Sequence, residues 1–130
     1  MKILLDTHII LWAIEDSINL PPEFRDMILD EKNDIYVSAA SFWEIALKHK
    51  KHPLLMPFSA KQIREYCQRS GYIFLSLSID SVSSFENLDL SSNQDPFDQI
   101  LTSQASCNNM VLITHDARIA NYNLPCVKYC

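Results

Sequence analysis

The chain is short of glycine, of long hydrophobic runs and of any secretory signal. Gly71 is its one glycine among 130 residues, so few turns can use glycine's conformational freedom. No apolar run approaches the roughly 20 residues of a membrane-spanning helix. The opening MKILLDTHII reaches Asp6 too early for a signal-peptide core. We expect a soluble cytoplasmic protein in which residues 1–130 form one domain, since repeats and linkers are also missing.

Cysteine is sparse and unpatterned. The four cysteines form no Cys-x-x-Cys pair: Cys67, Cys107, Cys126 and Cys130. Reduced thiols are expected in the cytoplasm. Cys126 and Cys130 could hold zinc only together with His49 and His52, and these spacings match no common finger.

Positive charge is in deficit. With 11 basic and 16 acidic side chains, the net charge is −5, which argues against coating nucleic acid through bulk positive charge. The one basic concentration, KHKKH at positions 48–52, favours a solvated helix end over a contact with an RNA backbone. The objection to nucleic acid weakens if several acids converge on divalent cations.

Short apolar segments alternate with helical patterns along the chain. Strands are predicted at residues 2–5, 35–37, 72–75 and 110–113, with a further strand around Val127. Helices are predicted at residues 7–15, 22–31, 39–50, 60–70, 80–88 and 96–107, and from Asp116 onward. Ser38, Ser59 and Asp95 are the expected N-caps, and Gly71 the residue that ends its helix. This alternation predicts an α/β fold with a parallel sheet covered by helices on both faces.

Acidic residues follow two of these strands. Asp6 comes directly after ILL, and Asp116 closely follows VLIT, so both should project at the edge where parallel sheets bind ligands. Each aspartate would also serve as an N-cap for the next helix.

Two further acids lie on predicted helices. Glu44 shares a narrow polar strip of SFWEIALK with Ser41 and Lys48, and that strip either faces a cleft or carries an exposed Glu44–Lys48 pair. In QDPFDQIL, Asp95 is best explained as an N-cap, while Asp98 falls in the first helical turn.

Carboxylates gathered in this way suit Mg²⁺ or Mn²⁺, which prefer oxygen ligands. Without cations the acids would repel one another. Paired ions can activate water and stabilise the leaving oxygen of a phosphodiester. Thr7 and Thr114 either hold metal-bound water or act as structural caps.

Four segments together carry a family resemblance: LLDTHIILW, SAASFWEIALK, DPFDQILTSQA and LITHD. In this order and at this length, the chain resembles the PIN-domain nucleases, and among them the VapC-type toxins of bacterial toxin–antitoxin pairs. The resemblance implies a three-layer α/β/α sandwich with a short parallel sheet. It also implies endoribonuclease activity with Mg²⁺ or Mn²⁺, an RNA substrate, a cognate antitoxin and a homodimer.

The resemblance also implies roles for particular residues. Asp6, Glu44, Asp98 and Asp116 match the family's catalytic, metal-binding acids. Thr114 matches its hydroxyl residue, and Asp95 is an accessory.

Two other functions compete with the nuclease. One is a catalytically inactive module that keeps the fold and binds a basic partner peptide in its acidic pocket. The other is phosphotransfer on Asp6, which generally needs an acid two residues later, where this chain has His8. His8 and His115 flank the acids and are more simply neighbours than phosphate contacts. Trp12 and Trp43 are expected to pack between helices and sheet.

Overall fold

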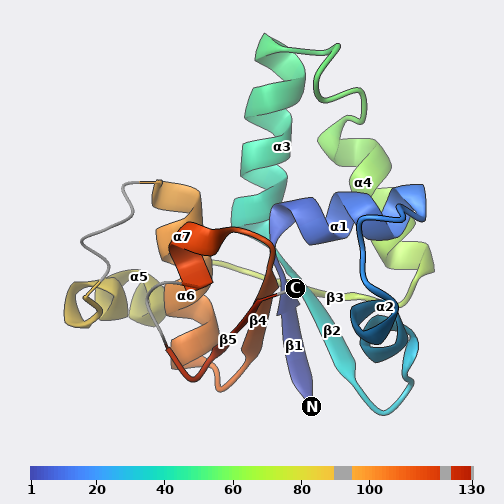
Figure 1. Cartoon of the computed structure of the whole chain (residues 1–130). Coiled ribbons are helices and arrows are strands. Elements are labelled where there is room, and N and C mark those ends of the chain that lie inside the picture. Colours follow the sequence, from blue (N-terminus) through green and yellow to red (C-terminus); the bar gives the residue numbers. More distant parts are fainter. Residues whose placement is uncertain (90–94, 121–123, 130) are drawn as a thin grey trace.

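The computed structural model describes residues 1–89, 95–120 and 124–129 (Figure 1). Its strands are β1 (Lys2–Leu5), β2 (Asp34–Ser38), β3 (Ile73–Leu75), β4 (Val111–Thr114) and β5 (Val127–Tyr129). Its helices are α1 (Thr7–Glu15), α2 (Pro22–Leu29), α3 (Ala39–Lys51), α4 (Ala60–Arg69), α5 (Ile79–Ser84), α6 (Pro96–Cys107) and α7 (Ala117–Ala120), with a 3₁₀ turn, η1 (Phe85–Asn87), after α5.

The strands form one parallel sheet in the order β3-β2-β1-β4-β5. The chain builds outward from β1 on one side and then returns to build β4 and β5 on the other. The order therefore reverses between β1 and β4, and open parallel sheets bind ligands beside such a reversal. Leu5 pairs with Ile113 there, and the Asp6 amide donates to the Ile113 carbonyl at 3.0 Å.

Alternate residues of β1 enter different cores. Ile3 and Leu5 pack on one face with side chains from α1, α2 and α4, whereas Leu4 packs on the other with α6 and α7. All three side chains are fully buried, as expected for a central strand covered on both faces. The predicted fold class, a parallel sheet between two helical layers, is confirmed.

Most predicted element ends agree with the structure to within a few residues. Ser59 caps α4 with a full capping box, and Gly71 adopts the left-handed φ of +77° after it, so both predictions are confirmed. The second helix ends at Leu29, two residues earlier than predicted. The helix predicted at 80–88 divides into α5 and η1.

Two packing predictions are wrong. Trp43 is 61% exposed; it belongs to α3, a helix that extends beyond the sheet (Figure 1). Trp12, by contrast, packs as expected against the first core, the one that contains Ile3 and Leu5. The third strand was expected to be covered on both faces, but it lies at the sheet edge with Ile73 and Phe74 substantially exposed.

Within the described ranges, every helix is too short or too polar to span a bilayer.

Candidate functional site

Asp6 and Thr114 lie side by side at the carboxyl ends of β1 and β4. Asp6 is 4% exposed. Its Oδ1 accepts from the Thr7 amide at 2.7 Å, and its Oδ2 accepts from the Thr114 hydroxyl at 2.7 Å. The Thr114 hydroxyl oxygen accepts in turn from the Asp116 amide at 3.0 Å. Thr114 thus fixes the position of the aspartate of each strand end.

Both expected aspartate N-caps are present as well. Asp6 caps α1 through the Thr7 amide, and Asp116 accepts from the Arg118 amide at 2.8 Å at the start of α7. Capping and convergence are therefore compatible, because both helices begin at the same edge of the sheet.

Glu44 reaches this edge from α3. It is buried, its Oε1 accepts from the Thr7 hydroxyl at 2.7 Å, and its Oε2 pairs with Lys48 Nζ at 2.6 Å. The Glu44–Lys48 pair is present, but the prediction that it is exposed is wrong for Glu44, which is buried while Lys48 is half-exposed. Ser41, also on the strip, lies 3.0 Å from the same threonine hydroxyl.

Asp98 comes from the first turn of α6 and is also buried. Asp95 caps that helix by accepting from the Phe97 and Asp98 amides at 2.9 and 3.4 Å, so the predicted cap is confirmed. The cap fixes where α6 begins and hence where Asp98 lies.

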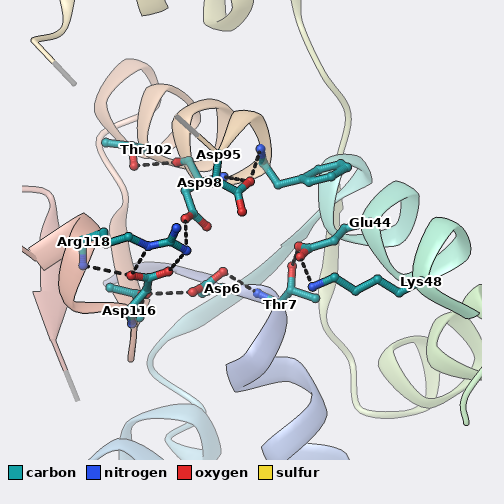
Figure 2. Close-up of polar contacts among 11 residues, drawn as sticks. Asp6, Thr7, Glu44, Lys48, Asp95, Asp98, Thr102, Asp116 and Arg118 are labelled. Atoms are coloured by element: carbon teal, nitrogen blue, oxygen red, sulfur yellow. Dashed lines mark hydrogen bonds and ion pairs between the residues drawn. The ribbon is translucent and has the colours of Figure 1, made fainter. Parts of the chain in front are cut away.

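Arg118, on α7, joins the last two acids. Its Nη2 lies 2.8 Å from Asp116 Oδ2 and 3.5 Å from Asp98 Oδ2, and its Nε donates to Asp116 Oδ1 at 3.2 Å. Figure 2 shows the guanidinium between the two carboxylates. Arg118 was not among the residues predicted from the sequence, although it is a basic residue two positions after the candidate ligand Asp116.

Together these contacts form one polar network (Figure 2). It runs in the order Glu44, Thr7, Asp6, Thr114, Asp116, Arg118 and Asp98. Its four acids come from β1's end, α3, α6 and the segment after β4. The structure therefore brings all four predicted acids, and both predicted threonines, into one connected site.

Asp6 and Asp116, the two acids that follow strands, differ electrostatically. Burial raises the pKa of the Asp6 carboxyl, despite the lowering effect of its bonds with Thr114 and Thr7. The hydrogen bond from Arg118 lowers the pKa of Asp116. Asp6 is thus a buried acid for which the ionised form is costly, whereas Asp116 already has a cation beside it.

The chemistry of the donors fits a hard divalent cation, since the four acids offer only oxygen. In their present positions, however, no three Asp, Glu, His or Cys side chains of the described residues are close enough together to hold an ion. A cation that took ligands from both Asp98 and Asp116 would replace the Arg118 guanidinium, which supplies positive charge there now.

The two histidines that flank the acids lie in a neighbouring pocket. His8 and His115 line it together with Trp12, Asp116, Ala117 and Arg118.

Two side chains of the basic cluster at 48–52 make contacts within the protein. Lys48 pairs with Glu44, and His49 Nδ1 lies 2.8 Å from the Met56 carbonyl oxygen.

Comparison with known proteins gives a family and a fold. The family model for the PIN domain matches residues 3–124. A chain of VapBC2 from Rickettsia felis, crystallised with a DNA fragment from its promoter, superposes with a TM-score of 0.71 at 17% identity, over 99% of this chain and 98% of that one. A chain of a toxin–antitoxin complex from Klebsiella pneumoniae gives 0.60 at 20% identity, over 96% and 94%. No curated protein matches in sequence.

Proposed function

Because the chain belongs to the PIN domain family, whose members are generally nucleases, we propose that it is an endoribonuclease that requires Mg²⁺ or Mn²⁺. The observation that carries the proposal is the convergence of Asp6, Glu44, Asp98 and Asp116 in one network at the sheet's switch point. Three of these carboxylates are buried, and buried charges in proteins are normally paired or bound to metals.

In this proposal Asp6, Glu44, Asp98 and Asp116 are the residues that would hold the metal. When bound, the cation supplies an activated water and stabilises charge on the phosphodiester oxygens. The chain's own contribution is orientation. Thr114 holds Asp6 and the Asp116 backbone, and Thr7 holds Glu44.

Asp95 contributes at one remove, because its cap sets the start of the helix that carries Asp98. It is a positioning residue rather than a ligand in this account. The chain's net charge of −5 is no obstacle to RNA binding if cations fill the site, because a loaded site presents positive charge to the phosphate.

We further propose that the enzyme is the toxin of a toxin–antitoxin pair. The Klebsiella pneumoniae structure that shares this fold is a toxin–antitoxin complex, and the Rickettsia felis structure that shares it is VapBC2 bound to DNA from its promoter. An antitoxin arginine would suit the acidic site, since a guanidinium already lies between Asp98 and Asp116. We also propose a homodimer, as the family resemblance implies, which sedimentation would detect as about twice the 15.0 kDa chain mass.

The test of the nuclease is cleavage of a single-stranded RNA by purified protein with Mn²⁺, with and without excess chelator. Asp98→Asn should lose at least about a hundredfold in rate, because a charged ligand becomes a neutral one. Asp26→Asn makes the same change at an exposed position of α2 and should leave the rate unchanged. Cleavage that persists in excess chelator would contradict the metal mechanism.

The same protein preparation distinguishes the nuclease from the inactive binding module. If the protein is the inactive module, calorimetry should detect Mn²⁺ binding that Asp98→Asn weakens, but the wild type should cleave no RNA.

The toxin assignment is tested by expression. Wild-type protein alone should arrest growth, whereas co-expression with the neighbouring gene product should restore growth and yield a copurifying complex. Normal growth with confirmed expression and no copurifying neighbour would remove the toxin assignment but leave the nuclease.

A further inference from the structure

A pocket of about 330 Å³ adjoins the carboxylates. This volume is at the low end of the roughly 300–1,000 Å³ typical of small-molecule sites, which suits an occupant of about the size of one nucleotide. Asp116 and Arg118 belong both to the pocket lining and to the acidic network. Whatever occupies the pocket therefore lies directly beside the proposed cleavage site.

The rings of Trp12 and His115 belong to the pocket lining, and that of Tyr129 lies behind His115, outside the lining. The rings of Trp12 and His115 have centroids 5.0 Å apart, and the His115 ring is stacked on that of Tyr129 at 5.4 Å and 11°. Trp12 is anchored because part of its side chain packs against the first core, whereas His115 is exposed. Rings held in place and open to solvent are surfaces on which nucleobases stack, whatever their identity.

Basic groups are also present in the lining. His8 and Arg118 contribute nitrogen donors, and a planar guanidinium is well suited to phosphate oxygens. The lining thus combines aromatic faces with phosphate donors, and it meets the carboxylates at Asp116. An aromatic packing cluster would not explain the nitrogen donors, and an ion-pair network would not explain the rings.

We propose that this pocket binds one unpaired nucleotide of the RNA next to the scissile phosphate, with its base against Trp12 and His115 and its phosphate toward Arg118. The inference rests on the proposed ribonuclease function and assigns a subsite to it. A base inside a duplex is already stacked on both faces, so the pocket selects single-stranded or looped RNA.

The test is a cycle between the protein rings and the RNA base. The cleavage position in a short single-stranded RNA is mapped first. Two further RNAs then each carry one abasic ribose, either just before or just after the cleavage position. On intact RNA, His115→Ala and Trp12→Leu should each lower kcat/KM about tenfold, mainly through KM. On the abasic RNA that lacks the bound base, the kcat/KM of wild type should fall by a similar factor. On that RNA, the kcat/KM of each variant should differ from that of wild type by less than about twofold.

Trp43→Leu is the matched control, because this tryptophan is exposed and lies outside the pocket lining. It should leave kcat/KM for both RNAs unchanged. Equal losses by the pocket variants on intact and abasic RNA would show that the rings act only by supporting the fold, and would overturn the inference.

A binding measurement gives a second readout. The chain has two tryptophans, so Trp43→Phe leaves Trp12 as the only indole fluorophore. In Asp98→Asn protein with this change, single-stranded RNA should quench Trp12 fluorescence, and the same RNA annealed to its complement should quench it far less. Equal quenching by both RNAs, or none by either, would count against the subsite.

The two proposals fail separately. If wild-type protein cleaves no RNA with Mn²⁺ present, the proposed function is wrong and the subsite falls with it. If wild type cleaves RNA while the pocket variants match it on both substrates, only the subsite is wrong.

Discussion

Replacing Asp6 by asparagine should stabilise the metal-free protein, although the substitution removes a charged hydrogen-bond acceptor from the core. Asparagine resembles the neutral form of aspartate in shape, and burial raises the pKa of Asp6 because the ionised form is poorly solvated. Desolvation of a buried ion costs several kcal/mol. Asparagine has one acceptor oxygen, which can keep the bond from the Thr7 amide, whereas its amide nitrogen must donate to the Thr114 hydroxyl oxygen instead of accepting from it. These changes cost about 1 kcal/mol for each of the two bonds.

The net expected gain is about 1–2 kcal/mol near pH 7, which corresponds to a Tm higher by roughly 3–10 °C for a domain of this size. The gain should depend on pH in a defined direction. An acid whose pKa is raised by folding favours the folded state below its unfolded pKa of about 3.9 and loses that contribution as pH rises through the folded value. The difference between Asp6→Asn and wild type should therefore be small near pH 4 and grow toward neutrality.

The assay is thermal unfolding followed by circular dichroism in chelator across this pH range, with Asp26→Asn as the exposed control. Manganese should then reverse the order, because wild type gains about 2.7 kcal/mol at a metal concentration 100 times Kd, whereas the Asp6→Asn protein gains less. A variant that melts several degrees below wild type in chelator at neutral pH would refute the reasoning. So would an equal metal-induced shift in both proteins.

Other expected outcomes concern the remaining parts of the site and the thiols. Arg118→Ala should tighten Mn²⁺ binding by about two- to fivefold in calorimetry, since an exposed guanidinium that competes for the same carboxylates is removed; weaker binding would mean that the arginine supports the site instead. Thr114→Val should lower the free energy of unfolding by about 1–3 kcal/mol in chelator, because the Asp6 carboxylate and the Asp116 amide each lose a buried partner; denaturation with an unchanged midpoint would contradict this. Iodoacetamide should label exposed Cys107 well before Cys67, because burial raises the pKa of the Cys67 thiol to about 12; peptide mass spectrometry that finds Cys67 labelled first would be the opposite result.

Much of the fold could be predicted from local sequence, for a local reason. A strand such as Lys2–Leu5 and a helix such as Pro96–Cys107 are specified by the period of their apolar residues and by the residues at their ends. Asp95 capped its helix as predicted because a cap needs only its neighbours two and three residues on. Once strands and helices alternate, a parallel sheet follows, and the ends of β1 and β4 must meet at one edge.

The placement of the acids at that edge was also within reach of the sequence. Asp6 and Asp116 each follow a strand directly or closely, so their location depends only on strand direction. For Glu44 the sequence left open a side chain facing a cleft and an exposed pair with Lys48. The structure has the pair, but Glu44 itself is buried and accepts from Thr7. Its burial depends on the depth at which α3 packs, which no local pattern encodes. The role of these residues as metal ligands stays a prediction.

What tertiary structure alone decided is the presence or absence of a neighbour. Trp43 and Trp12 look alike in the sequence, yet Trp43 is 61% exposed, whereas Trp12 packs against the core and His115. Arg118 gave no local sign of bridging Asp98, which lies far earlier in the chain. Burial, ion pairing and the pocket depend on which distant segments share a place in space, and period and capping carry no information about that.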